Sequence, residues 1–585
     1  MADLATTVES TGAASLLDRK MKKAPAWISG AVALVALLGG LGYVGFHIAG
    51  DLGGVSLGSF WPYALLATAL LIALAFEFVN GFHDTANAVA TVIYTHSLEP
   101  NIAVVWSGLC NLTGVLTSQG AVAFTIITLL PVELILKVSS GAGFAMVFAL
   151  LIAAILWNLG TWWLGLPASS THTMTGSILG VGLANQLMSS GAGGTSGVDW
   201  EQAAKVFRVL LISPLVGFGY AAVLFMILKP KTRVWGLLLS APATALVCVS
   251  LYQLSWLWTI VLAFGVAGLL WLAFKAIPTP DALFKAPEGD QPPPLAIRAL
   301  LVLTCTGVSF FHGSNDGQKG MGLIMLILIG TVPTAYALNH AVTAHDMQDF
   351  IAASEQAVSI VDAHVDRAAI LGPDSRDELT DYLRTKKVQP VTMTALRELI
   401  RDLEGDVRVY SSYKNVPASQ QSNVRNDMYV TSEALRLMMK NHQGNFNEDE
   451  VAALNNYKAK IDKATKFIPS WVKVAVALAL GLGTMVGWKR IVVTVGEKIG
   501  KEHLTYGQGA AAELVAMGTI YAADSFGLPV STTHVLSSGV AGTMAANNSG
   551  LQFSTIRNIA AAWVFTLPAA ALLSGSLYWL FRHTS

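Results

Sequence analysis

The sequence predicts an all-α membrane protein that crosses the bilayer many times and consists of two related units, with a hydrophilic domain inserted in the second. Only 13% of the 585 residues are charged and 53% are hydrophobic, whereas soluble chains carry roughly 25% charged residues. Many apolar runs have the length that crosses a bilayer, about 18–25 residues. Two pairs of polar motifs recur among these runs, which indicates an internal duplication.

The first pair of motifs places one acidic residue in each unit. Asn80–Thr91 reads NGFHDTANAVAT and His312–Gly322 reads HGSNDGQKGMG. Aligned on the glycine that stands second in each motif, they superpose Asp84 on Asp316. An ionisable group at membrane depth is costly enough to mark a functional site. We expect the two carboxylates to bind a cation or a proton near the midplane; the structural alternative is that they cap broken helices.

The second pair of motifs interrupts apolar runs with a proline and a cluster of hydroxyls. Leu166–His172 reads LPASSTH and Leu528–His534 reads LPVSTTH. Non-helical backbone at membrane depth is tolerated only where protein buries it or where it lines a wet cavity. Each stretch therefore predicts a re-entrant hairpin or a broken helix.

The spacing between the motifs locates the insertion. Asp84 precedes Ser169 by 85 positions, whereas Asp316 precedes Ser531 by 215 positions. The excess of 130 positions matches the length of the polar stretch Ala341–Ser470. One insertion in the second unit therefore accounts for the whole difference.

Residues 1–25 form a polar N-terminal tail that ends in a basic segment. A signal peptide is the alternative, because a basic segment precedes an apolar core. The apolar run Ala26–Ile48 is too long for such a core, and no small-residue cleavage site follows it. We expect an uncleaved first helix with a cytoplasmic N-terminus, in accordance with the positive-inside rule.

The first membrane unit extends over residues 26–274. Its loops at Lys229–Arg233 and after Phe274 are basic and are separated by two spans, so both should face the cytoplasm. The segment 275–297 is rich in proline and charge and is the expected linker between the units. The further apolar runs of the unit lie near residues 60–79, 102–130, 143–166, 204–228, 234–250 and 256–274.

The second membrane unit comprises residues 298–340 and 470–585, and the insertion between them, 341–469, differs in character. Charged residues are frequent in the insertion, and apolar residues recur there at helical spacing. We expect a small helical domain outside the bilayer. If the run 295–338 crosses once, this domain is extracytoplasmic, whereas two crossings would place it in the cytoplasm. We favour the single crossing.

The hydroxyl clusters are candidates for holding a tetrahedral oxyanion. Hydroxyl and backbone N–H donors at the N-terminus of a half-helix suit such an anion, because the helix dipole attracts negative charge. The alternative is structural, since hydroxyls commonly cap helices. The candidate substrate-binding residues are Asp84, Ser169, Ser170, Thr171, Asp316, Ser531, Thr532 and Thr533.

Basic and amide side chains inside the acidic motifs complete the set of candidates. His83 precedes Asp84, and Lys319 follows Asp316 by three positions. A lysine beside an intramembrane aspartate is either a plain buried salt bridge or a cation next to the substrate anion. The candidate coupling-ion residues are His83, Asp84, Asn87, Asn315, Asp316 and Lys319.

The four motifs, with the flanking stretches GTMVGWKRI and LPAAALLSGSLYW, closely resemble the inorganic phosphate transporter (PiT) family, and within it the bacterial low-affinity Pit-type permeases. The resemblance extends over nearly the whole chain. It implies a polytopic inner-membrane protein with two inverted repeats and a central phosphate site. It also implies symport of phosphate with protons, as a neutral complex with a divalent cation such as Mg²⁺. Asp84 and Asp316 are then the candidate metal ligands, no cofactor is permanently bound, and a homodimer is compatible.

One departure from the family pattern concerns the coupling ion. The sodium-coupled members typically read G-A-N-D-V-A-N-A, whereas this chain has His83 before the first aspartate. In the second copy Lys319 stands where the later asparagine would be. We hypothesise that these basic side chains replace sodium ions electrostatically and leave protons as the coupling ion.

Two other functions stay open from the sequence. A sodium-coupled phosphate carrier, or a carrier of a related oxyanion, would use the same fold. A phosphate-responsive receptor would use the inserted domain as its sensor. An enzyme is disfavoured, because the hydroxyl clusters show no base and orienting group of the kind that nucleophilic catalysis needs. The equal numbers of Lys+Arg and Asp+Glu, 37 each, do not indicate a nucleic-acid partner.

Overall fold

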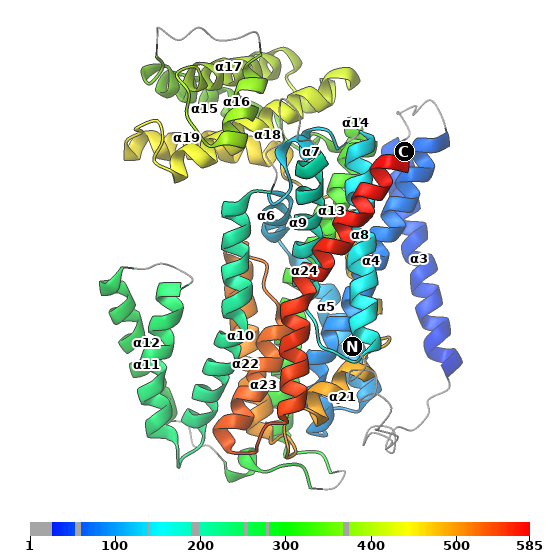
Figure 1. Ribbon diagram of the computed structural model, residues 1–585, viewed down its shortest axis with the longest axis vertical. Coiled ribbons are helices and arrows are strands. Elements are labelled where there is room, and N and C mark those ends of the chain that lie inside the picture. Colours follow the sequence, from blue (N-terminus) through cyan, green and yellow to red (C-terminus); the bar gives the residue numbers. More distant parts are fainter. Residues whose placement is uncertain are drawn as a thin grey trace.

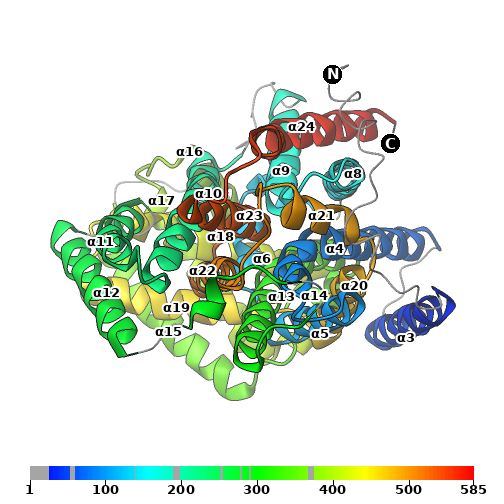
Figure 2. The same ribbon diagram turned by 90° about the horizontal axis from the view of Figure 1, so that it is seen from below.

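The structure of this chain is a computed structural model built almost entirely of helices (Figures 1 and 2). It describes residues 26–52, 60–138, 140–188, 198–250, 255–276, 280–288, 291–366 and 374–584. These ranges contain no β-strand, so the prediction of an all-α fold is confirmed. The predicted N-terminal tail, 1–25, lies outside the described residues.

Long apolar helices dominate the first predicted membrane unit. One of them, α4, contains the acidic motif of this unit, and α8 ends just before the hydroxyl motif. The helices are α3 (Ala26–Leu52), α4 (Phe60–Tyr94), α5 (Pro100–Thr117), α6 (Ala121–Ile127), α7 (Val132–Leu136), α8 (Gly141–Trp163), α9 (Ser170–Met188), α10 (Trp200–Leu228), α11 (Arg233–Ser250) and α12 (Trp256–Ala276), followed by the 3-10 helix η1 (Asp281–Phe284).

The second predicted unit begins with one continuous helix, α13, which contains the whole second acidic motif. It runs from the end of the protein near η1 to the end near the inserted domain (Figure 1), as a single crossing requires. The helices of this unit are α13 (Leu295–Thr331), α14 (Pro333–Tyr336), α20 (Ser470–Thr484), α21 (Lys489–Glu497), α22 (Tyr506–Ser525), α23 (Thr532–Asn547) and α24 (Phe553–Thr584).

Five described helices are long and apolar enough to cross a membrane: α4, α8, α10, α13 and α24. Two bent pairs raise this number to seven if each pair counts as one span. The pairs are α5 with α6, bent by 77°, and α19 with α20, bent by 71°. The chain is therefore a multi-pass membrane protein.

The residues predicted as an inserted domain form a helical layer at one end of the protein (Figure 1). Polar contacts join this layer to the membrane helices: Lys386 pairs with Asp199 at 2.8 Å, and Asn426 donates to the Leu136 carbonyl at 3.2 Å. The exact domain boundaries stay a prediction. The helices of the layer are α15 (Ala344–Ala363), α16 (Ser375–Thr385), α17 (Thr392–Tyr410), η2 (Tyr413–Asn415), α18 (Ala418–Lys440) and α19 (Glu448–Thr465).

The apolar run expected near residues 102–130 is not one straight helix. α5 ends at Thr117 and α6 begins at Ala121, and Gly120 between them has a φ of 87°. Glycine adopts this left-handed conformation without the steric cost that other residues incur, so the chain can turn sharply here. Hydropathy concealed the break, because it does not report the direction of the backbone.

The helices α9 and α23, which follow the two hydroxyl motifs, begin beside each other. The Thr171 hydroxyl donates to the Val530 carbonyl at 2.9 Å, and the rings of His172 and His534 have centroids 4.4 Å apart. From this point α9 runs toward the inserted domain and α23 runs away from it (Figure 1). Two inverted repeats would produce such an opposed pair; the repeats themselves stay a prediction.

Glycines allow α5 and α13 to approach each other closely. A Cβ on Gly114 would lie 2.0 Å from the Phe310 carbonyl oxygen, and a Cβ on Gly313 would lie 2.2 Å from the Asn111 carbonyl oxygen. Small residues at helix interfaces permit this approach within membranes. The contact fixes the position of α13, and therefore of Asp316, relative to α5.

Replacing Gly114 with alanine is expected to lower the free energy of unfolding by about 1–3 kcal/mol, the usual cost of overpacking a filled interior. Gly219 of α10 provides the control, because its Cβ position has no packing neighbour within 4 Å beyond the adjacent backbone of α10. Gly219→Ala should be neutral or slightly stabilising, since alanine favours a helix. Thermal unfolding of the detergent-solubilised protein measures both variants, and equal melting temperatures would contradict the assigned contact.

Candidate functional site

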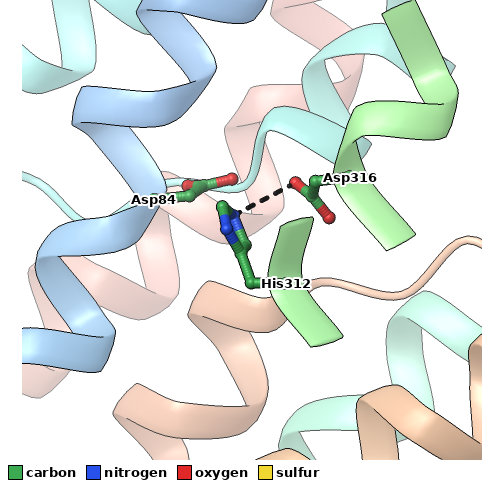
Figure 3. A group of neighbouring side chains, drawn as sticks. All are labelled: Asp84, His312 and Asp316. Atoms are coloured by element: carbon green, nitrogen blue, oxygen red, sulfur yellow. Dashed lines mark ion pairs between the residues drawn. The ribbon is translucent and has the colours of Figure 1, made fainter. Parts of the chain in front are cut away.

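The four motifs meet in one place inside the membrane part of the protein. α4 carries Asp84, α13 carries Asp316, and hydroxyls from the first turns of α9 and α23 bond to these acids. Figure 3 shows the two carboxylates facing each other from their helices, with the imidazole of His312 beside both. The three side chains are buried. Polar groups that the sequence separates by hundreds of residues therefore form one centre.

Donors from three helices surround the Asp84 carboxylate. Ser170 of α9 donates to Oδ2 at 2.5 Å, and Thr533 of α23 donates to Oδ1 at 2.7 Å. Oδ1 also lies 3.0 Å from Nδ1 of His83, whose Nε2 lies 3.0 Å from the Thr161 hydroxyl. Asp84 is thus held by residues of both hydroxyl motifs and by the histidine that precedes it.

The Asp316 carboxylate has a cationic partner. Nζ of Lys319 lies 2.7 Å from Oδ1 and also donates to the Thr171 hydroxyl. The Ser170 hydroxyl lies 3.2 Å from Oδ2. Lys319 is completely buried, and a buried ammonium group left without such a partner is strongly destabilising. Both alternatives raised for this lysine, a salt bridge and a cation next to the substrate, fit its position.

Sequence reasoning missed His312, although this residue begins the second acidic motif. Its Nδ1 lies 2.9 Å from Oδ1 of Asn111, and the amide nitrogen of Asn111 donates to Thr484 at 3.0 Å. The Asn111 oxygen therefore accepts, and Nδ1 of His312 carries the hydrogen. Nε2 is the ring nitrogen that faces Oδ2 of Asp316, at 3.6 Å. Metal-binding histidines are commonly oriented through their second nitrogen in this way.

Three side chains in the centre could share a cation. Asp84, His312 and Asp316 each offer one ligand atom, and these atoms all lie within 4.8 Å of one another. Carboxylate oxygens suit Mg²⁺, and an added imidazole nitrogen suits transition metals such as Zn²⁺. The two predicted metal ligands, Asp84 and Asp316, are therefore close together and have a third potential ligand.

Two of the predicted hydroxyls cap helices. Ser169 accepts from the backbone N–H of His172, and Ser531 accepts from that of His534, each at 3.2 Å. The structural alternative therefore applies to these two serines. The Thr532 hydroxyl is buried and has no hydrogen-bond partner within the described ranges, so a bound anion could use it.

The two predicted asparagines lie in different surroundings. Asn315 donates to the Leu528 carbonyl at 3.1 Å and accepts from the Val530 N–H at 3.4 Å. It therefore braces the proline-containing turn that leads into α23. The side chain of Asn87 lies outside the described part of the structure.

The first turns of α9 and α23 bring partial positive charge to the centre. The N-terminus of a helix carries about half an elementary charge and leaves N–H groups free to bond an anion. Here two such termini lie against two carboxylates. Groups that bind anions and groups that bind cations therefore share one buried centre.

A further buried acid lies outside this centre. Glu513 of α22 is completely buried and accepts hydrogen bonds from the hydroxyls of Thr91 and Thr304. It belongs to neither repeated motif, so the duplication provided no signal for it. Its neighbours come from α4 and α13, the two helices that carry the central acids.

Comparisons with known proteins identify relatives over most of the chain. The family model described as "PHO4: Phosphate transporter family" matches residues 80–574. The low-affinity inorganic phosphate transporter PitA of Escherichia coli (strain K12) is 40% identical over 529 residues, covering 88% of this chain and 96% of that protein. PitB of the same strain is 37% identical over 528 residues, and the low-affinity inorganic phosphate transporter of Buchnera aphidicola subsp. Acyrthosiphon pisum is 35% identical over 536 residues, each with the same coverage.

One solved structure, described as "The sodium-dependent phosphate transporter", aligns with a TM-score of 0.49 at 17% identity. The alignment covers 89% of this chain and 100% of that chain.

Proposed function

Because this chain belongs to the phosphate transporter family, we propose that it imports inorganic phosphate as a complex with a divalent cation and in symport with protons. The family predicted from the motifs is confirmed. The relatives at 35–40% identity are named low-affinity inorganic phosphate transporters. What we propose beyond the family is that phosphate travels as a complex with a divalent cation and that the proton is the coupling ion.

One observation carries the proposal: ligands for a cation and donors for an anion lie in the same buried centre. Asp84 and Asp316 face each other, and the first turns of α9 and α23 lie beside them. Two carboxylates would repel a phosphate dianion, whereas a divalent cation between them and the phosphate removes the repulsion. The hydroxyls and N–H groups of the two helix starts would then hold the phosphate oxygens.

In this proposal the divalent cation is cargo, held by Asp84, His312 and Asp316. Mg²⁺ would use the carboxylates and keep several of its waters. A transition metal such as Zn²⁺ would also take the imidazole nitrogen. No permanently bound cofactor is proposed.

The proposed coupling ion is the proton, because a basic side chain contacts each central acid. His83 lies 3.0 Å from Asp84, and Lys319 lies 2.7 Å from Asp316. These residues stand where the sodium-coupled pattern has asparagines. A positive charge at these positions would disfavour a sodium ion at the same carboxylate, which leaves the proton as the proposed coupling ion.

We propose that the protein lies in the inner membrane with the inserted domain on the extracytoplasmic side. α3 ends near this domain, since Tyr336 of α14 donates to Asp51 at 2.5 Å, so α3 begins at the opposite end. Basic residues gather at that opposite end, after α10 and around α21 (Figure 1), and such residues stay in the cytoplasm. They are Lys229, Lys231, Arg233, Lys489, Arg490, Lys498 and Lys501.

Phosphate would accordingly enter from the side of the inserted domain. A homodimer stays a prediction, since the structure contains one chain.

Uptake of labelled phosphate into proteoliposomes tests the proposal. An imposed pH gradient should drive uptake, a divalent cation should be required, and sodium should have no effect. Uptake driven by sodium alone would leave the family intact and contradict the coupling ion. No uptake by the folded protein under either gradient would contradict transport itself.

Replacing His312 with glutamine is expected to reduce uptake with Zn²⁺ about 10–100-fold, the range found when the surroundings of a metal site are altered. Uptake with Mg²⁺ should change much less, because Mg²⁺ favours oxygen ligands. Initial rates measured against the concentration of each cation distinguish the two effects. His345→Gln is the control, since this side chain is 81% exposed in the inserted domain. An equal loss with both cations would show that His312 is structural.

A further inference from the structure

α4 carries a second buried acid, Glu77, two helical turns before Asp84 and on the same face. Its side chain is completely buried and packs on the backbone of α13: a Cβ on Gly320 would lie 2.3 Å from its Oε1. Asn80, which lies one turn from Glu77 toward Asp84, is equally buried. Glu77, Asn80 and Asp84 form a polar stripe along α4. The part of α4 that precedes Glu77, from Phe60 to Phe76, has no charged residue.

The polar atoms of this stripe are poorly satisfied. Neither carboxylate oxygen of Glu77 and neither polar atom of the Asn80 amide makes a hydrogen bond of standard geometry in the described residues, although the Asn80 amide and the Gly320 N–H lie near enough to act on the Glu77 carboxyl group. Buried side-chain polar atoms are normally bonded, and exceptions often mark a functional group. A buried carboxylate without a cation in contact is costly when ionised and far less costly when it carries a proton.

The charged groups that act most strongly on Glu77 come from α13. Asp316 and Lys319 are the charged side chains that act on its carboxyl group. The ammonium of Lys319 is engaged elsewhere, by Asp316 at 2.7 Å and by Thr171. An ionised Glu77 would therefore lie near a second negative charge, without a cation in contact.

The other helices packed on α4 do not supply a partner. The acids of α21 and α22 that bond to α4, Glu497 and Glu513, do so at Tyr94 and Thr91, at the far end of α4 from Glu77. α5 and α8 contain no charged residue, and the one charged residue of α20, Lys473, donates to the Ser118 carbonyl at 2.6 Å. α9 and α23 contribute His172 and His534, which stack on each other. These surroundings favour Glu77 as a neutral carboxyl group while Lys319 is bonded to Asp316.

Glu77 also lies on the side from which the proposed import begins. α4 and α13 are antiparallel: Arg298, near the start of α13, donates to the Ser97 carbonyl just beyond the end of α4, at 2.8 Å. Between the inserted domain and Glu77, neither α4 from Phe60 to Phe76 nor α13 from Met321 to Thr331 contains an acidic or basic residue. Glu77 is the first acid that a proton entering along these helices would meet.

We propose that Glu77 carries the coupled proton, separately from the cation held by Asp84 and Asp316. The proposal rests on the proton symport proposed above. Lys319 links the two sites, because it donates to Thr171 at the start of α9, where phosphate would bind, and it is the chain neighbour of Gly320, on which Glu77 packs.

The link makes phosphate and proton travel together. While phosphate engages Lys319, Glu77 has no cation to stabilise its ionised form and keeps its proton. After phosphate has left on the cytoplasmic side, Lys319 is free to pair with Glu77, which then releases one proton and becomes a carboxylate. Reprotonation from the outside returns Lys319 to Asp316.

Glu77→Gln tests the proposal, because glutamine resembles the protonated acid and cannot release a proton. In proteoliposomes, exchange of labelled for unlabelled phosphate without a gradient should stay within about twofold of the wild type, whereas accumulation driven by a pH gradient should fall at least about tenfold, within the usual range of coupling between sites. Glu99→Gln is the control, since Glu99 is exposed at the start of α5 and makes no side-chain cap; it should change neither readout.

Each result with Glu77→Gln supports or overturns the role of Glu77 as the proton carrier. Retained accumulation in Glu77→Gln would overturn it, and loss of both exchange and accumulation in folded protein would show that Glu77 serves the substrate site or the structure. Glu77→Asp, which keeps a titratable group, should recover accumulation with an altered dependence on external pH; failure to do so would also count against the proposal. If the wild type shows no accumulation under a pH gradient, the proposed symport fails first, independently of Glu77.

Discussion

Asp84→Asn is expected to reduce phosphate uptake at least about 100-fold, because it removes half of the negative charge that the central acids offer to a cation. Substitutions of residues that only surround a metal site already reduce metal affinity or activity by about 10–100-fold. The substitution preserves the size of the side chain. It also places an amide N–H₂ where Ser170 or Thr533 now donates to a carboxylate oxygen, so these hydroxyls would have to turn. One of the two first turns, that of α9 or that of α23, would lose its acceptor on residue 84.

Initial uptake of labelled phosphate by purified Asp84→Asn in proteoliposomes measures this effect. Asp374→Asn is the control, because Asp374 caps α16 in the inserted domain and asparagine caps a helix about as well as aspartate. The control should transport at the wild-type rate. Asp84→Asn that folds normally and retains more than a tenth of the wild-type rate would show that the carboxylate is not central.

The double substitution His83→Asn and Lys319→Asn is expected to make uptake depend on sodium. Both basic groups contact a central acid, so their removal leaves two buried carboxylates without these basic partners. Sodium ions can then occupy these positions, and asparagine supplies an oxygen ligand at each. Stimulation by sodium of about tenfold would correspond to a typical coupling between two binding sites.

Uptake by the double variant is measured with and without sodium, under a pH gradient and without one. Lys319→Arg is the control, because arginine keeps the positive charge and should leave uptake independent of sodium. Proton-driven, sodium-independent uptake in the double variant would contradict the idea that His83 and Lys319 act as substitutes for sodium.

Duplication made much of the centre predictable. Asp84 and Asp316 were identifiable because each recurs at the same place in a motif, and repetition is a signal that does not depend on hydropathy. The same held for the hydroxyls of Ser170 and Thr533, which the structure places on Asp84. The all-α fold followed from the apolar runs, and the spacing of the motifs predicts where an insertion lies.

The features that the sequence could not predict are those that depend on which helices pack together or on the direction of the backbone. The bond from His312 to Asn111 joins α13 to α5 across 201 positions, and neither residue has a counterpart of the same type in the other unit. The break at Gly120 was hidden because apolar residues continue on both sides of it. The roles of Ser169 and Ser531 were also hidden. Their repetition fits helix capping as well as substrate contact, and only the bonds from the backbone N–H groups of His172 and His534 show that they cap.

The hydrogen bond from Thr533 to Asp84 joins residues 449 positions apart, which has a consequence for biosynthesis. A ribosome adds roughly 5–20 residues per second, so the acid of α4 waits in the membrane for about 20–90 seconds before its last partner is made. During that interval the carboxylate lacks a neighbour that holds it in the finished protein. A truncated or stalled chain that ends before α23 therefore cannot complete the centre, and the first half alone should not form a working pathway across the membrane.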